Sequence, residues 1–283
     1  MTSIVLLAVA MSFSGNSAFE FTRQAVQLGP RPSGSPAIQK LQASITTKLR
    51  SFGCEVTEEN FAASTPAGPV AMKNILCRLK GDGTSNRALV VSGHYDTKLM
   101  TDRVFVGAND AGSSTGILLE LARVSAQQKR KRDLWIVFFD GEEAVGQWSA
   151  SNSLYGSRYQ ADRWSATGLL SRIDALINVD MLGDKDLNVL KDQNSSSNLI
   201  TLVWKVAADL GYGKHFENSI TAIEDDHIPF RRRGVPAIDL IDFEYGPLNR
   251  YWHTEKDTLD KLSPGSMEIA GKVVMETLRR LDK

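Results

Sequence analysis

The sequence predicts an α/β fold, a three-layer α-β-α sandwich whose central sheet is mixed but mostly parallel. Apolar runs of strand length recur along the chain, and segments with helical spacing of apolar residues separate them. Acidic residues and histidines follow directly after several of these runs. Continuous apolar runs are typical of strands buried on both faces, and helices that alternate with such strands cover both sides of a parallel sheet.

The first predicted elements are a helix and an antiparallel pair of strands. A Pro/Gly/Ser-rich turn at residues 30–36 precedes apolar residues with helical spacing, and this pattern stops at Gly53. The runs CEVTEENF and MKNILCRLKG then predict two neighbouring antiparallel strands. The run ALVVSGHYD predicts the first strand that is buried on both faces.

Helices and buried strands then alternate to the C-terminus. The further strands are predicted at DLWIVFFD, DALINVDMLG and VPAIDLID. The helices are predicted at SSTGILLELARVSAQQ, SLYGSRYQA, residues 197–210, IPFRRRG and the tail from Pro264. Ligands in such sheets bind outside the carboxyl ends of the strands, and we therefore expect the functional site at that edge.

The composition limits the classes of partner. The chain has 283 residues, with 33 basic and 33 acidic side chains and an apolar fraction of 42%. This length fits one large α/β domain, and the apolar fraction is enough for a sizeable core. A net charge of zero argues against nucleic acid as the main partner, because phosphate binding needs a basic excess or at least a basic face. The basic run Arg231–Arg233 is typical of a solvated helix end.

The N-terminus resembles a secretion signal. IVLLAVAMSF is followed by small residues, as in the apolar region and cleavage site of such signals, although no basic residue precedes it. We assign residues 1–20 to a candidate signal or disordered leader and residues 21–283 to a single domain. No apolar run is long enough to span a membrane. Export to the periplasm or the medium is favoured slightly over a cytoplasmic location.

The two cysteines, Cys54 and Cys77, lie in the two predicted neighbouring strands. They are too few for a disulfide framework and lack the spacing of a metal motif. Two buried thiols are the default interpretation, and a single disulfide is the alternative if the chain is exported.

Polar residues collect at one edge of the predicted sheet. They are the residues that follow the buried strands, together with one aspartate from the loop before a helix: His94, Asp96, Asp110, Asp140, Glu142, Glu143, Asp180, Trp252 and His253. Gathered carboxylates repel one another, so a divalent cation is expected among them. Histidine and carboxylates without thiolates suit a catalytic zinc site with an open position. The candidate ligands are His94, Asp110, Glu142 or Glu143, Asp180 and His253.

Each of these residues taken alone has an ordinary structural interpretation. Asp96 is typical of a turn or helix cap, and His215 of a satisfied core histidine. Adjacent glutamates such as Glu142 and Glu143 are usually a solvated pair. Their common position at one sheet edge favours function instead. Adjacent side chains point in different directions, so one glutamate can bind a metal while the other serves as general acid and base.

The motifs, taken together and in order, resemble the zinc-dependent exopeptidase superfamily from about residue 70 to the C-terminus. They are GHYDTK, GANDAGSSTGILLELAR, FFDGEEA, LYGSR, NVDMLG, DDHIPFRRRGVPA and WHTEKDTLD. Two branches of the superfamily compete: the dinuclear zinc aminopeptidases and the animal-type glutaminyl cyclases.

The resemblance implies roles for individual residues. Asp110, Glu143 and His253 resemble metal ligands, and Glu142 resembles the acid/base glutamate. In the aminopeptidase branch, His94 and Asp180 would complete a site for two zinc ions. In the cyclase branch one zinc is held, and Asp180 instead joins Glu142 and Asp225 in a hydrogen-bond network.

Several features favour the cyclase branch. Trp148 in DGEEAxxxWS, the doubled aspartate Asp225–Asp226 and Trp252 before His253 are similar to the cyclases. Ordinary packing is the alternative interpretation of both tryptophans, but their proximity to ligand candidates favours pocket walls. One departure is Glu224, because the cyclases tend to have a neutral amide there.

The resemblance therefore implies an enzyme that converts the N-terminal glutamine of peptides or proteins to pyroglutamate with release of ammonia, using one zinc ion. The alternative is an aminopeptidase that hydrolyses N-terminal residues with two zinc ions. A non-catalytic binding module on the same fold is a third interpretation. It usually requires the loss of a ligand or of the acid/base residue, and the sequence retains all of them.

Overall fold

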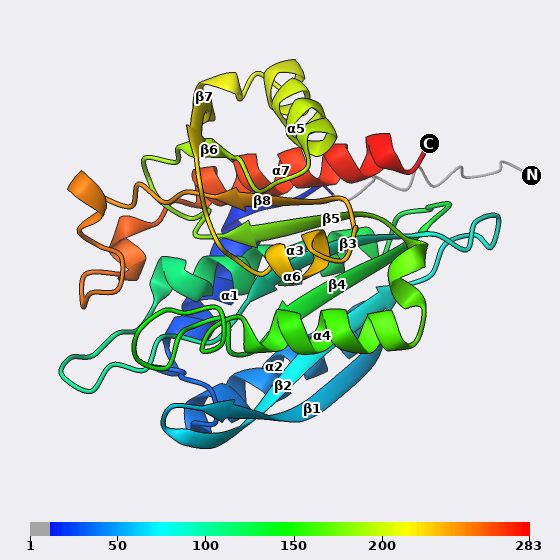
Figure 1. Cartoon of the computed structure of the whole chain (residues 1–283). Helices are drawn as coiled ribbons and strands as arrows, with labels where there is room; N and C mark the ends of the chain where they lie inside the picture. Colours follow the sequence, from blue (N-terminus) through cyan, green and yellow to red (C-terminus); the bar gives the residue numbers. More distant parts are fainter. Residues whose placement is uncertain (1–11) are drawn as a thin grey trace, which may run out of the picture.

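The computed structural model describes residues 12–283, and in this part of the chain a central six-stranded sheet has the order β1-β2-β4-β3-β5-β8 (Figure 1). Its strands are β1 (Glu55–Thr65), β2 (Gly68–Leu79), β3 (Ala88–His94), β4 (Asp133–Phe139), β5 (Ile173–Asp180) and β8 (Ala237–Ile241). The strands β4, β3, β5 and β8 pair in parallel, whereas β1–β2 and β2–β4 pair antiparallel. The predicted mixed, mostly parallel sheet is confirmed.

Helices cover both faces of this sheet and complete the three predicted layers (Figure 1). One face carries α1 (Gly15–Val26), α2 (Pro36–Phe52), α3 (Ser114–Ser125), α5 (Ser197–Asp209) and α7 (Pro264–Leu281). The other carries α4 (Tyr155–Ala166) and the short α6 (Ile228–Arg231). Single 3₁₀ turns lie at Leu169–Arg172, Gly213–His215, Pro247–Asn249 and Leu259–Lys261.

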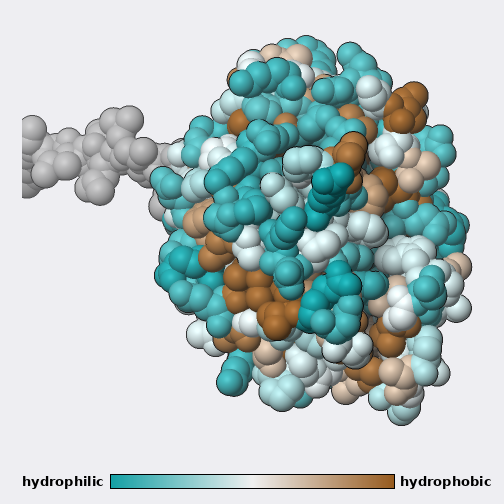
Figure 2. All heavy atoms as spheres, turned by 90° about the vertical axis from the view of Figure 1, so that its left-hand side faces the viewer, coloured by the Kyte–Doolittle hydropathy of each residue, from teal (hydrophilic) through white to brown (hydrophobic). Residues whose placement is uncertain are grey.

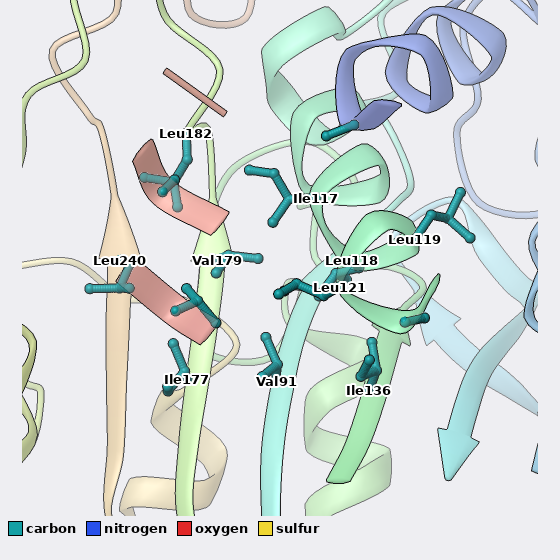
Figure 3. Close-up of a cluster of buried hydrophobic side chains, with 14 of the residues drawn as sticks. Val91, Ile117, Leu118, Leu119, Leu121, Ile136, Ile177, Val179, Leu182 and Leu240 are labelled. Atoms are coloured by element: carbon teal, nitrogen blue, oxygen red, sulfur yellow. The ribbon is translucent and has the colours of Figure 1, made fainter. Parts of the chain in front are cut away.

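Strand β4 shows why the apolar runs are continuous. Its alternate residues enter different cores: Ile136 and Phe138 face the layer that contains α3, whereas Trp135 and Val137 face α4 and α6. Figure 3 shows the first of these cores, in which α3 lies over the central strands. Its labelled side chains include Ile117, Leu118, Leu121, Val91, Ile136, Ile177, Val179 and Leu240. Each such side chain stabilises the fold by about 1.5–3 kcal/mol through burial.

Helix α2 follows the predicted boundaries closely. The Ser35 side chain accepts a hydrogen bond from the backbone N–H of Ile38 at 3.2 Å, and Pro36 occupies the first turn. Gly53 ends the helix in the left-handed region, at φ 94°, which glycine adopts without strain.

Three elements were not predicted. Helix α1 begins at Gly15, so residues 15–20 of the expected leader form its first turns; residues 1–11 of that leader lie outside the described residues. It packs closely on α3, because a methyl group added at Gly116 would come within 2.3 Å of the Ala18 carbonyl oxygen. Strands β6 (Val189–Asp192) and β7 (Phe216–Thr221) form a small parallel pair. Most of β7 is exposed, which explains the missing apolar pattern.

The cysteines form a disulfide that ties Cys54, at the start of β1, to Cys77 in β2. The disulfide alternative is therefore the observed one, and the expectation of two free thiols was wrong. Within residues 12–283, no helix combines the length and apolar character needed to cross a bilayer.

We predict that this disulfide stabilises the fold. Replacing both cysteines with alanine should lower the free energy of unfolding by about 3 kcal/mol, because the cross-link restricts a loop of 23 residues in the unfolded chain. Urea denaturation followed by circular dichroism measures the change. Reducing the wild-type protein should give a similar loss, and reductant should not affect the double variant. Equal stability of oxidised and reduced wild-type protein would contradict the prediction.

Candidate active site

Except for His94, the predicted site residues line one pocket of about 430 Å³ at the carboxyl ends of β3, β4 and β5, on the left-hand side of Figure 1. Figure 2 faces this side of the molecule, where apolar patches lie between hydrophilic side chains. The pocket is lined by Lys98, Asp110, Glu142, Glu143, Gly146, Gln147, Trp148, Asp180, Ala222, Ile223, Glu224, Asp225, Ile241, Phe243, Trp252 and His253.

Asp110, Glu143 and His253 form one group of potential metal ligands. The Nε2 atom of His253 lies 3.0 Å from Glu143 Oε1 and 3.2 Å from Asp110 Oδ2. One donor atom from each residue lies within 4.8 Å of the others. The two carboxylates are buried and the imidazole is half-buried, so a cation bound here would exchange its water for protein ligands.

A second group shares Asp110 with the first. The Nε2 atom of His94 lies 3.1 Å from Asp180 Oδ1 and 3.2 Å from Asp110 Oδ1. These three residues also satisfy the spacing of a metal site. The described residues thus contain both donor groups that the one-metal and two-metal alternatives require, and Asp110 belongs to each.

The turn that carries Asp110 is held from the C-terminal part of the chain. Residues Ala108–Ser113 form a wide helical turn in which the Asp110–Ala111 peptide bond is cis. The Asp257 carboxylate accepts hydrogen bonds from the backbone N–H groups of Asn109 at 2.8 Å and Asp110 at 3.2 Å. The Tyr245 hydroxyl donates to the same carboxylate at 2.7 Å, so Asp110 has little freedom to move.

Asp96 positions the adjacent glutamates. Its two carboxylate oxygens accept hydrogen bonds from the backbone N–H groups of Glu142, at 3.1 Å, and Glu143, at 3.4 Å. The side chains then diverge: Glu143 contacts His253, whereas Glu142 Oε2 lies 4.0 Å from His94 Nδ1. This agrees with the structural interpretation of Asp96 as a turn residue and with the expectation that the two glutamate side chains point in different directions.

Burial and mutual repulsion raise the pKa of several carboxyl groups. Burial raises the pKa of Glu142 well above its usual value, and the nearby Glu143 and Asp225 add to the effect. Burial also raises the pKa of Asp180 to about 6, although His94 opposes the change. Negative charge is therefore costly here, and a bound cation would relieve the repulsion.

The histidines respond in the opposite direction. Burial alone would lower the pKa of His253, but the carboxylates of Glu143 and Asp110 raise it to about 9. The same balance raises the pKa of His94, which is surrounded by Asp180, Asp110 and Asp96. Both imidazoles face an excess of negative charge, which is the environment in which a divalent cation binds.

Arg31 and Lys98 also compensate this charge, and neither was predicted. The buried Arg31 guanidinium donates to the carbonyl oxygens of Gly29, Val106 and Gly107 and attracts the nearby carboxylates of Asp257, Asp96 and Asp110. Lys98 Nζ lies 3.4 Å from Glu143 Oε2. The only sequence signal for Arg31 was its position in the Pro/Gly-rich turn at residues 30–36. That position did not indicate burial, because arginines in turns usually lie on the surface.

Aromatic side chains form the pocket walls. The ring of Trp252 stacks on His253 with centroids 3.9 Å apart, and Phe243 meets Trp252 edge-on at 4.9 Å. Trp148 also lines the pocket, remains 41% exposed and directs its indole N–H toward Glu224 Oε2 at 3.5 Å. The structure therefore brings both predicted tryptophans to the pocket, together with the unpredicted Phe243.

Asp225 is buried and lines the pocket, whereas Asp226 and His227, which follow it, are fully buried and do not line it. His227 Nε2 lies 3.0 Å from Asp192 Oδ2, away from both ligand groups. His215 contacts the carbonyl oxygen of Leu187 through Nδ1 at 3.0 Å, as expected for a structural histidine.

The sequence model for peptidase family M28 matches residues 74–278. The chain belongs to this family. Glutaminyl-peptide cyclotransferase from Drosophila melanogaster is 34% identical over 254 residues, and the match covers 81% of this chain and 70% of that relative. The fold and the motifs that resembled the zinc-dependent exopeptidase superfamily are thus confirmed as those of a family member.

Solved structures extend the comparison to the whole described fold. Glutaminyl cyclase from an Acidobacteriales bacterium is 38% identical with a TM-score of 0.92, and the match covers 100% of this chain and 99% of that one. A Zn-dependent exopeptidase from Parabacteroides distasonis is 27% identical with a TM-score of 0.86, covering 95% of this chain and 98% of that one. A glutaminyl cyclase and a Zn-dependent exopeptidase therefore share this architecture.

We predict that His253 contributes to metal affinity. Replacing it with alanine should weaken Zn²⁺ binding by more than about 100-fold, because loss of even an outer partner of a metal ligand costs about 10- to 100-fold. Competition with a chromophoric chelator measures the affinity. His215→Ala is the matched control, since His215 belongs to neither donor group. Equal affinity of the His253 and His215 variants would argue against this ligand.

Proposed function

We propose that this protein is a zinc-dependent glutaminyl-peptide cyclotransferase. It would convert the N-terminal glutamine of peptides or proteins to pyroglutamate and release ammonia. The supporting observation is a single pocket in which the buried Glu142 lies beside a metal-ligand group and below aromatic walls that contain Trp148 and Trp252. Similarity to relatives named for this reaction supports the proposal.

The reaction joins two groups of the same residue. The substrate's α-amine attacks the carbon of its own γ-carboxamide, a C–N bond closes the five-membered ring, and the original amide C–N bond breaks. One proton must leave the attacking amine and one must reach the departing ammonia. Glu142 can carry that proton between the two nitrogens as general base and then general acid.

The donor chemistry of Asp110, Glu143 and His253 fits zinc, because their carboxylate and imidazole atoms converge without thiolates. When bound there, zinc would supply Lewis-acid polarisation of the γ-carbonyl oxygen. Asp180 and Asp225 line the pocket beside Glu142, and we assign them to holding Glu142 in place and stabilising its protonated form.

The aromatic walls fit an intramolecular reaction. Trp148 and Trp252 would enclose the glutamine side chain and favour the folded conformation in which amine and amide meet. They would also exclude water, which competes with the amine as a nucleophile. Ring closure needs no water molecule, whereas peptide hydrolysis uses a water molecule as the nucleophile.

The second candidate function is a zinc aminopeptidase that hydrolyses N-terminal residues. The group of His94, Asp110 and Asp180 favours it, because it offers a second metal position. Similarity to a Zn-dependent exopeptidase also favours it. In this reaction Glu142 would take a proton from water instead of from the substrate's amine.

The disulfide supports a location outside the cytoplasm. Disulfides persist in oxidising compartments, and the bridge between Cys54 and Cys77 therefore favours export to the periplasm or the medium. Recovery of the native protein with both thiols reduced would argue for a cytoplasmic location.

Replacing Glu142 with glutamine should abolish proton transfer while keeping the size of the side chain. We expect kcat for ammonia release from a glutaminyl peptide to fall about 10²- to 10⁴-fold. Zinc content, measured on the same preparation, should not change. Glu217→Gln, on the exposed β7, is the control. Full activity of the Glu142 variant would contradict both candidate reactions.

The reaction itself is tested by the metal count and by two substrates. We expect one zinc per chain by mass spectrometry of the metal content, ammonia release from glutaminyl amide peptides and no leucine release from leucyl amides. Removing zinc with a chelator should stop the reaction, and adding zinc should restore it. Two zinc ions per chain with leucine release would instead establish the aminopeptidase.

A further inference from the structure

The pocket has a buried floor and an exposed rim. Asp110, Glu142 and Glu143 at the floor are almost fully buried, whereas Trp148 is 41% exposed and the Glu224 side chain is 52% exposed. When the first residue of a bound peptide reaches the floor, the rest of the peptide must extend outward across this rim. Its second residue therefore passes the side chains of the rim, and Glu224 is one of them.

Acidic side chains outnumber basic ones among the residues that line the pocket. Among the described residues that line the pocket, the basic side chain other than His253 is Lys98, which is mostly buried and contacts Glu143. Glu224 has an exposed partner, Arg232, whose Nη2 lies 3.6 Å from Glu224 Oε1. An ion pair this exposed is weak and readily exchanged, because water screens it. The Glu224 carboxylate is thus available to a cation that enters with the substrate.

Trp148 fixes one side of this carboxylate. The indole N–H points toward Glu224 Oε2 at 3.5 Å, so the negative charge lies beside the tryptophan that forms a pocket wall. The Glu224 carboxylate therefore lies where a peptide that enters the pocket would pass it.

We propose that Glu224 determines specificity for the residue that follows the N-terminal glutamine. It favours lysine or arginine at that second position and disfavours aspartate or glutamate. This inference rests on the proposed function, since it concerns the second residue of a glutaminyl substrate. Glu224 is a specificity residue and takes no part in moving the proton.

The expected effect is modest and sensitive to salt. An exposed ion pair changes an equilibrium by about 1.5- to 5-fold, and repulsion of an acidic residue adds to the difference. The kcat/KM ratio of a Gln-Lys substrate to a Gln-Glu substrate should therefore be about 3- to 10-fold. The ratio should fall in 0.5 M salt, because at high ionic strength the interaction between exposed charges extends over only a few ångströms.

Three amide dipeptides, Gln-Lys, Gln-Ala and Gln-Glu, test the proposal with the intact enzyme. In Glu224→Gln the Lys-to-Glu ratio should approach one, although the amide oxygen can still accept from Trp148. In Arg232→Gln the ratio should rise, because the competing partner is gone. Glu217→Gln, an acidic-to-neutral change outside the pocket lining, should keep the wild-type ratio.

Other roles of Glu224 give different results. If the carboxylate only orients Trp148 or binds the substrate's α-amine, Glu224→Gln should change kcat/KM for all three peptides by the same factor. An unchanged Lys-to-Glu ratio in this variant, with or without a common loss of rate, overturns the proposal. A ratio in wild-type enzyme that does not depend on salt overturns it as well.

A binding measurement separates this inference from the proposed reaction. Isothermal titration with the inactive Glu142→Gln variant gives dissociation constants for the same peptides without turnover. A preference for Gln-Lys that disappears in the Glu142→Gln, Glu224→Gln double variant supports the role of Glu224. Absence of ammonia release from any glutaminyl peptide overturns the proposed function, whereas equal binding of Gln-Lys and Gln-Glu overturns the specificity alone.

Discussion

Repulsion between buried carboxylates is the constraint on which the site depends. Parallel strands deliver Asp110, Glu142, Glu143 and Asp180 to one edge of the sheet, where little water remains to screen them. The arrangement persists because His94, His253, Arg31 and Lys98 supply positive charge or hydrogen-bond donors around them. A bound divalent cation would complete this balance, so structure and proposed chemistry depend on the same charges.

The sequence predicted the sheet and the edge of the site because both follow from local patterns. Continuous apolar runs identify strands that are buried on both faces of the sheet, as β4 demonstrates. The residues that follow such runs must lie at the edge formed by the carboxyl ends of the parallel strands. Asp110, Glu143 and His253 were among the candidate ligands expected at this edge, and they lie together. The antiparallel pair β1–β2 was predicted from two consecutive strand patterns, and the structure confirms it.

The elements that were missed depend on tertiary contacts that no local pattern records. Strand β7 is mostly exposed, and α1 begins within a segment whose composition resembles a leader. Arg31, Lys98, Asp257 and Phe243 act at the site only because distant segments meet there. The choice between one metal and two is equally hidden from sequence pattern, since Asp110 belongs to both donor groups.

The contacts made by Arg31 and Asp257 have a topological consequence. Arg31 holds the carbonyl oxygens of Val106 and Gly107 from one side, and Asp257 holds the amides of Asn109 and Asp110 from the other. The loop that presents Asp110 is thus clamped by two residues that are far apart in the sequence. The centre cannot assemble on a growing chain until Asp257 has been synthesised, and the segments that carry Arg31 and Asp257 are joined through the site itself.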